Sequence, residues 1–185
     1  MIRTPERLRQ VLAEPRRLGR ALSRHCYGMG QWVDIMGAKL ASLPTLEDKA
    51  LLARVIADNA RHALLFGNRA RELGEEPTTY RVPASGERIY QALARMTEPA
   101  ELLGYARGSL IHFSALLDVY RSVADEGSLA VIAAVQKDVD EHLRLLGERL
   151  QGVPDHERRR VEEAEALAEA LYADREEEEV GWYAS

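Results

Sequence analysis

Apolar residues recur three and four positions apart along most of the chain, which is the spacing of one face of an α-helix. Between a few clusters of Gly and Pro, the residues are mostly Ala, Leu, Glu and Arg, which are the strongest helix formers. No segment alternates apolar and polar residues between hairpin turns, as a half-buried strand would. The pattern therefore predicts an all-α protein.

Capping residues and helix breakers predict where each helix begins and ends. Thr4 and Pro5 open a short helix over 5–13, and a longer helix covers about 16–43. Thr45 caps the clearest helix, with Asp48 three residues on, and Gly74 ends it. The remaining helices are expected at 87–96, from Thr97 to about 124, from Asp125 or Ser128 to about 151, and from Pro154 onward.

The chain carries an internal repeat with an offset of 80 residues. When residues 22–69 are placed on 102–149, 11 of the 48 positions are identical, and the expected helix boundaries coincide. Two similar hairpins joined by one long crossover form a four-helix bundle. We expect 1–152 to form this bundle, with repeat 1 at about 16–74, the crossover at 75–97 and repeat 2 at about 98–152. Residues 153–185 would add a C-terminal helix and an acidic tail, and 5–13 a short N-terminal helix.

Composition narrows the class of protein without naming a function. The chain has 185 residues, a net charge of −5 and 46% apolar residues, which fits one domain with a short appendage. Its longest strictly apolar run, Leu129 to Val135, is far shorter than the roughly 20 residues that span a membrane. The acidic balance argues against a nucleic-acid partner. The single cysteine, and the lack of an apolar export signal after Met1, indicate a cytoplasmic protein.

Charge is concentrated at the two ends of the chain. Residues 1–24 hold seven Arg against two Glu, a local +5, and residues 155–185 hold eleven acidic residues against four Arg, a local −7. One interpretation is two solvated helix faces. The other is that the basic N-terminal arm lies against the acidic tail, within one chain or between two.

Two helical segments resemble the ferritin-like di-iron carboxylate proteins. Residues 56–63 (IADNARHA) and 72–74 (ELG) resemble their second bundle helix, and 137–142 (KDVDEH) resembles their fourth. The resemblance covers about 16–152 and is closest to the bacterial oxygenase and hydroxylase branch, which includes phenylacetyl-CoA oxygenase subunits and tRNA hydroxylases. It implies a bacterial ferritin-like four-helix bundle with a metal site in its core.

The metal ligands are where this chain departs from the family pattern. The family takes a Glu from two helices and Glu-x-x-His from the other two. Carried over to this chain, the histidines match at His62 and His142, but Asn59 and Val139 stand where the glutamates should be. The stretches 25–30 and 105–110, expected at the same depth on the other two helices, hold no carboxylate. The sequence therefore predicts a bundle that has lost the standard di-iron centre, with no cofactor.

A second observation keeps a metal in consideration. Asp58 and Asp138 each precede a histidine by four residues, so each shares a helix face with His62 or His142. Two Asp and two His would suffice for one iron or another divalent transition metal. The alternative is that the histidines are hydrogen-bonded core groups beside surface acids.

Other residues are candidates for a small pocket in the bundle. The pocket-lining candidates are Cys26, Tyr27, Asn59, Tyr105, His112 and Val139. Four glycines would let helices approach closely or leave room for a ligand: Gly28, Gly30, Gly104 and Gly108.

Two functions follow, and the sequence leaves open whether the chain is an enzyme. The first is a non-catalytic scaffold, partner subunit or binder of a small apolar ligand. The second is a metal-dependent oxidoreductase of the oxygenase or hydroxylase type, using the Asp/His set. The apolar stripe of the last helix is longer than a closed four-helix bundle requires. It predicts a homodimer or a partner protein subunit.

Overall fold

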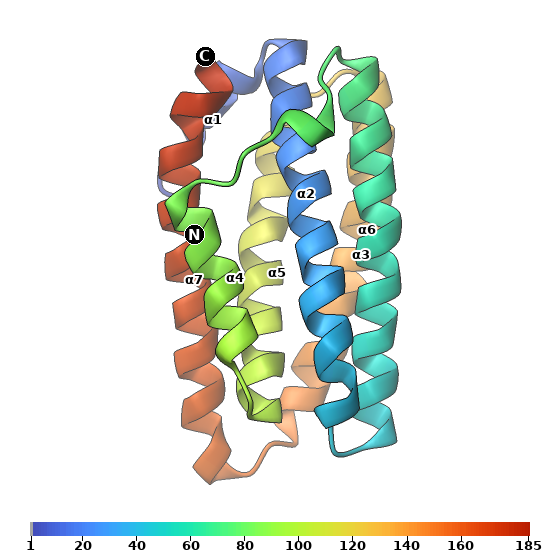
Figure 1. The fold of residues 1–185 in the computed structure, drawn as a ribbon, viewed down its shortest axis with the longest axis vertical. Coiled ribbons are helices and arrows are strands. Elements are labelled where there is room, and N and C mark those ends of the chain that lie inside the picture. The colour runs from blue at the N-terminus through green and yellow to red at the C-terminus, as the bar shows by residue number, and fades with distance from the viewer. Residues whose placement is uncertain (1) are drawn as a thin grey trace.

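The computed structural model describes residues 2–185, and Met1 lies outside them. The described residues form helices and contain no strand, so the all-α prediction is confirmed. The helices, shown in Figure 1, are α1 (Pro5–Leu12), α2 (Pro15–Lys39), α3 (Leu46–Glu72), α4 (Ala84–Arg95), α5 (Pro99–Arg121), α6 (Glu126–Gln151) and α7 (Asp155–Ala184). Two short 3₁₀ turns, η1 (Leu40–Ser42) and η2 (Pro77–Thr79), follow α2 and α3.

Local chemistry sets most of the helix ends. The backbone N–H of Asp48 donates to Thr45 Oγ1 at 3.0 Å, as predicted for the start of α3. Asp125, the first of the two residues proposed, caps α6 by accepting from the N–H of Ser128 at 2.8 Å. The prediction that Thr97 caps the next helix is wrong. Pro99 opens α5 after Glu98 instead, without a side-chain cap.

The bundle has the connectivity that the repeat predicted. Helices α2 and α3 form one antiparallel hairpin, and α5 and α6 form the second (Figure 1). The crossover between them carries η2 and α4 and returns the chain to the opposite end, so that α3 and α5 run in the same direction (Figure 1). This is the ferritin-like arrangement of a four-helix bundle with one long crossover.

Helix α7 is an integral part of the bundle rather than an appendage. It runs parallel to α5 and packs along it (Figure 1), and its apolar stripe is buried there at Val161, Ala164, Ala168 and Tyr172. Most of this stripe is therefore covered within one chain, and Leu167 of the same stripe is 44% exposed. The expected homodimer or partner protein subunit stays a prediction.

The N-terminal arm lies against the acidic tail within the chain, which was the second of the two charge interpretations. Arg3 donates to Asp174 at 2.8 Å and to Glu177 at 3.3 Å. Arg20 reaches the backbone carbonyls at the end of α7, including that of Tyr183 at 3.3 Å.

None of the described helices combines the length and apolarity that crossing a bilayer requires.

Candidate functional site

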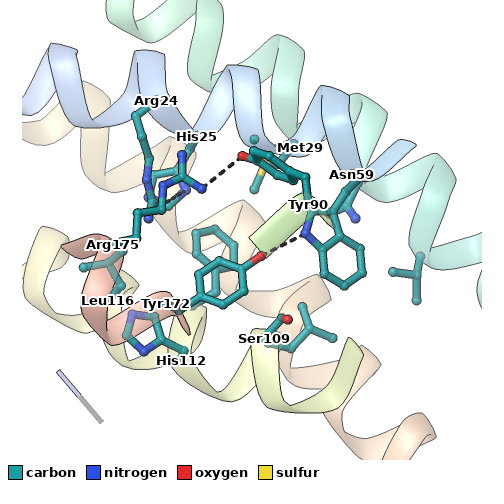
Figure 2. Close-up of a pocket in the computed structure, with 15 residues that line it drawn as sticks. Arg24, His25, Met29, Asn59, Tyr90, Ser109, His112, Leu116, Tyr172 and Arg175 are labelled. Carbon is teal, nitrogen blue, oxygen red and sulfur yellow. Dashed lines mark hydrogen bonds between the residues drawn. The ribbon is translucent and has the colours of Figure 1, made fainter. Parts of the chain in front are cut away.

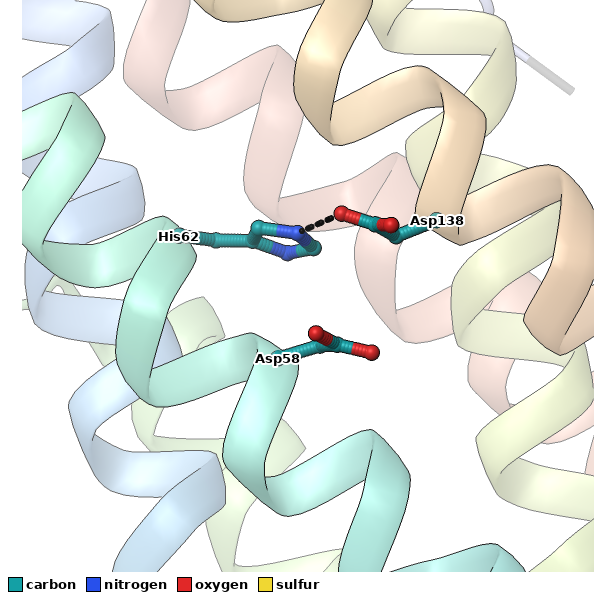
Figure 3. A group of neighbouring side chains, drawn as sticks. All are labelled: Asp58, His62 and Asp138. Carbon is teal, nitrogen blue, oxygen red and sulfur yellow. Dashed lines mark hydrogen bonds and ion pairs between the residues drawn. The ribbon is translucent and has the colours of Figure 1, made fainter.

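Two Asp–His pairs join α3 to α6 in a reciprocal pattern. His62 Nε2 on α3 lies 2.9 Å from Asp138 Oδ2 on α6, and His142 Nε2 on α6 lies 2.9 Å from Asp58 Oδ2 on α3. The repeat explains this symmetry. Asp138 is the repeat equivalent of Asp58, and His142 is that of His62, so each histidine binds the aspartate of the other repeat. The imidazoles are buried, whereas the carboxylates are 22–23% exposed. The pairs therefore lie at the edge of the α3–α6 interface, where Figure 3 shows three of the four side chains.

The guanidinium of Arg61 bridges the two carboxylates. Its Nη2 donates to Asp58 Oδ1 at 3.2 Å and also hydrogen-bonds to Asp138. Arg61 is half exposed and already supplies the positive charge that a bound cation would bring. Ligand atoms of Asp58, His62 and Asp138 nevertheless lie within 4.8 Å of one another, close enough to hold one metal ion, and His142 is outside that group.

The protonation states of these groups suit hydrogen bonding within the protein. Burial lowers the pKa of His62 by more than the Asp138 carboxylate raises it, so the ring is neutral at pH 7. Burial raises the pKa of Asp138, but hydrogen bonds from His62 and Arg61 outweigh this effect and lower it. A neutral imidazole thus donates to a carboxylate, and the other ring nitrogen of His62 has no hydrogen-bond partner among residues 2–185.

A separate cavity of about 60 Å³ is lined by residues of α2, α3, α4, α5 and α7. This volume exceeds the roughly 10–15 Å³ that one water needs. Aliphatic and aromatic side chains form most of its wall, among them Trp32, Leu110, Phe113 and Leu116. Polar groups converge on it from several helices (Figure 2), and they belong to Arg24, His25, Asn59, Ser109, His112 and Arg175.

A charged cluster beside this cavity is organised around Glu179 of α7, which does not itself line the cavity. Glu179 accepts from Arg24 Nε at 2.7 Å and from Arg175 Nε at 2.9 Å. The hydroxyls of Tyr80 and Tyr183 also donate to it. Burial alone would raise the pKa of Glu179, but Arg175 and Arg24 lower it to about 2. The carboxylate is therefore ionised, with two buried guanidinium groups beside it.

His25 is buried against the same cluster. Its Nε2 lies 2.8 Å from the Tyr120 hydroxyl, and its Nδ1 lies 3.0 Å from Arg24 Nη1. Burial, and then the positive charges of Arg24 and Arg175, lower the pKa of His25 well below 6.5. The ring is therefore neutral in the folded protein.

A pH dependence of stability follows from the neutral His25 ring. On acidification through pH 6.5, His25 takes up a proton in the unfolded chain but not in the folded one, so the free energy of unfolding falls. We expect His25→Gln to remove about 2 kcal/mol of the stability lost between pH 7 and pH 5. Urea unfolding at both pH values measures this, and equal losses in the two proteins would contradict it.

The structure brings three of the four metal-site candidates within reach of one ion and pairs the fourth, His142, with Asp58, but it separates the six pocket candidates. Asn59 and His112 line the cavity. Cys26 does not, because its Sγ faces α3, 3.0 Å from where a Cβ on Gly67 would lie. Tyr27 packs instead against the ring of Tyr80.

The other two pocket candidates also lie outside the cavity wall. Tyr105 is fully buried and donates its hydroxyl to the carbonyl of Ile89 at 3.0 Å, which turns the phenol away toward α4. Val139 is buried on α6, a helix that contributes no residue to the cavity wall.

Arg175, which lines the cavity, and Glu179, which binds it, are absent from the candidates that the sequence predicts. Both lie in a segment whose composition indicates a solvated acidic tail. A signal was present, because the apolar stripe of α7 continues past Tyr172 at Val180 and Tyr183 with helical spacing. Arg175 and Glu179 fall on that same buried face.

Two antiparallel hairpins joined by one long crossover define the class as a ferritin-like helical bundle. A family model described as a ferritin-like domain of actinomycetes matches residues 12–175. The chain therefore belongs to this ferritin-fold-like family. The match extends past residue 152 and includes most of α7. No curated protein and no solved structure matches the chain.

The residues present do not fit the di-iron centre that this class of bundle implies. Of the described residues, none that lines the core cavity is a carboxylate, whereas two are arginines. Asp58 and Asp138 lie at the α3–α6 edge, and each already binds a histidine and Arg61. Two divalent cations would lack the negative charge that holds them.

Proposed function

We propose that this protein is a ferritin-like bundle that works without a di-iron centre and binds a small ligand in its core cavity. The observation that carries the proposal is the cavity itself, with its apolar wall and its convergent polar groups. Among the described residues, two buried nitrogen atoms on that wall have no partner, Arg24 Nη2 and His112 Nδ1, whereas His112 Nε2 lies 3.5 Å from Glu176 Oε2. Buried polar groups in proteins are normally hydrogen-bonded, so a bound molecule would satisfy them.

The two aspartates that could bind a catalytic metal are already paired within the protein, which supports the same proposal. Asp58 and Asp138 link α3 to α6 through histidines, with Arg61 as their counter-ion. Such a set of hydrogen bonds holds two bundle helices together. In the proposed function the two aspartates, the two histidines and Arg61 are structural, and the core cavity is the functional site.

Xenon tests whether the cavity admits a ligand, because it enters apolar cavities without any chemical recognition. We expect the xenon-129 NMR shift to depend on protein concentration, and Ser109→Leu, which fills the cavity, to reduce this dependence strongly. Ser42→Leu is the matched control, because Ser42 is exposed on η1. Equal shifts for both variants and the parent protein would contradict a ligand-binding cavity.

The second candidate function is a metal-dependent oxidoreductase, and one observation favours it. Ligand atoms of Asp58, His62 and Asp138 already converge within 4.8 Å. Arg61 is half exposed, so its side chain has room to swing out and leave these ligands to a divalent cation. In that case Asp58→Asn would abolish metal binding, whereas in the proposed function no stoichiometric metal binds at all.

A further inference from the structure

We propose that the outer face of α3 is the interface of a homodimer, in which α3 packs against the antiparallel α3 of a second copy of this chain. Helix α3 lies at one side of the bundle, where its main neighbours are α2 and α6 (Figure 1). Its outer face is therefore uncovered within one chain. The interface is separate from the core cavity, so it goes beyond the proposed function and does not depend on it.

Apolar side chains follow this outer face with the spacing of a coiled-coil interface. Exposed residues recur alternately four and three positions apart, as do the a and d positions of a heptad repeat. These residues, called the α3 seam below, are Leu46, Ala50, Ala53, Ala57, Ala60 and Leu64. Leu46 and Leu64 are 77% and 69% exposed, more than any other large apolar side chain of residues 2–185. A helix face that stays in water normally carries polar residues, so the pattern indicates a face that is covered.

The α3 seam is not part of the face that α3 buries in the core. The core face includes Leu52, Val55 and Phe66, which are at most 2% exposed. Ala57 follows Val55 by two residues, which is a turn of about 200° around the helix, so the seam lies on nearly the opposite side. Helix α3 therefore has two apolar faces, and the bundle uses only one of them.

The internal repeat provides a comparison for this face on α6. The α6 positions equivalent to the α3 seam are also exposed, and they are Glu126, Ala130, Ala133, Lys137, Asp140 and Arg144. Four of these six residues are charged, whereas none of the six in the α3 seam is. The face on α6 therefore suits water. The repeat alone does not require an apolar face here, so the α3 seam needs an explanation of its own.

The α3 seam has the same residues in both directions from its centre, which points to a second copy as the partner. Counted from Val55, the two leucines lie nine residues away on either side, and the alanines lie five and two residues away. In an antiparallel pair centred on Val55, the facing residues are Leu46 with Leu64, Ala50 with Ala60 and Ala53 with Ala57. A two-fold interface needs this self-complementarity, because both subunits use the same patch.

The charges beside the α3 seam favour the antiparallel orientation. The flanks of the seam carry both signs, at Glu47, Lys49, Arg54 and Arg61, and the two arginines already pair with carboxylates of their own chain. An antiparallel pair places Arg61 beside Glu47 of the second copy. It also places Lys49 beside the uncharged Ala63. A parallel pair would place Lys49 beside Arg54, and these two have the same charge.

Sedimentation equilibrium of the full chain across micromolar concentrations tests the proposal. We expect a monomer–dimer equilibrium with a dissociation constant of about 1–50 µM, which fits a small interface. Ala53→Glu should weaken the dimer by at least about tenfold, because it places a charge in the centre of the seam. Ala133→Glu, the equivalent change on α6, should leave the dimer unchanged. Both alanines are exposed, so both variants should fold, and circular dichroism checks this.

Disulfide cross-linking tests the orientation, in a chain whose single cysteine is removed by Cys26→Ala. An antiparallel pair brings position 50 beside position 60 of the second copy. The two copies of position 50 then lie ten residues apart along the pair, or about 15 Å. Ala50→Cys/Ala60→Cys should therefore form a covalent dimer on mild oxidation. Ala50→Cys alone should not, because Cα atoms more than about 7 Å apart cannot be bridged.

Each contrary result overturns a stated part of the proposal. A monomer at every concentration would show that no second copy covers the α3 seam. Equal dimerisation of the parent protein and Ala53→Glu, or equal weakening by Ala53→Glu and Ala133→Glu, would contradict an interface at the seam. Cross-linking of Ala50→Cys alone would contradict the antiparallel pair. None of these results bears on the core cavity, so the xenon experiment still decides the proposed function.

Discussion

Glu179→Gln should lower the free energy of unfolding by about 3–5 kcal/mol, because it leaves two buried arginines without a carboxylate. The lowered pKa of Glu179 gives a second value for the stability that this carboxylate contributes. A shift from 4.5 to about 2 corresponds to about 3 kcal/mol of stability at neutral pH. Because the folded pKa is the lower one, this contribution is present above pH 4.5 and is lost as the pH falls toward 2. Urea unfolding at pH 7 measures the loss directly.

A matched control for this prediction lies two residues away. Glu177 is on the same helix, is 58% exposed and pairs with Arg3 on the surface. Glu177→Gln should therefore change stability by less than about 1 kcal/mol. If the two variants lost similar amounts, the buried cluster would not be the source of the stability assigned to it.

Gly108→Ala should destabilise the protein by about 2 kcal/mol or more, because α5 and α7 touch at this glycine. A Cβ on Gly108 would lie 2.6 Å from the carbonyl oxygen of Glu165 and 2.8 Å from its Cα, so the α7 backbone would have to move. Overpacking of this kind costs about 1–3 kcal/mol in protein cores, and flexible side chains cannot relieve a clash with backbone.

Gly30→Ala is the comparison variant, because we expect it to raise the stability of the protein rather than lower it. Gly30 lies within α2, and a Cβ there would have no neighbour within 4 Å. The change should stabilise the protein by about 0.5–1 kcal/mol through helix propensity alone. Thermal unfolding of both variants measures the difference. A stabilising Gly108→Ala would mean that α7 does not pack on α5 as closely as described.

The fold was predictable because its signals are local or repeated. Helix formers, breakers and the caps at Thr45 and Asp125 define most of the helices, and the repeat defines the two hairpins. Of the four glycines singled out, Gly104 and Gly108 do permit close helix packing, against Val161 and Glu165 of α7. The sequence did not say which helix they would face.

The site was only partly predictable because its key contacts join distant helices. The spacing of Asp58 and His62 shows that they share a helix face. It does not show that each pairs with the opposite copy, or that Arg61 bridges the carboxylates. Arg175 and Glu179 were missed because charged residues in an acidic segment usually face solvent. Their burial depends on Arg24 from α2, more than 150 residues earlier in the chain.

Metal content is the measurement that tests the central claim most directly. The protein would be produced in medium supplemented with iron, manganese and zinc, and analysed by mass spectrometry beside an Asp58→Asn/His62→Gln double variant. The account predicts well under one metal per chain in both proteins, with the parent protein folded. Near-stoichiometric metal in the parent, lost in the double variant, would contradict it and make the Asp58, His62 and Asp138 group the functional site.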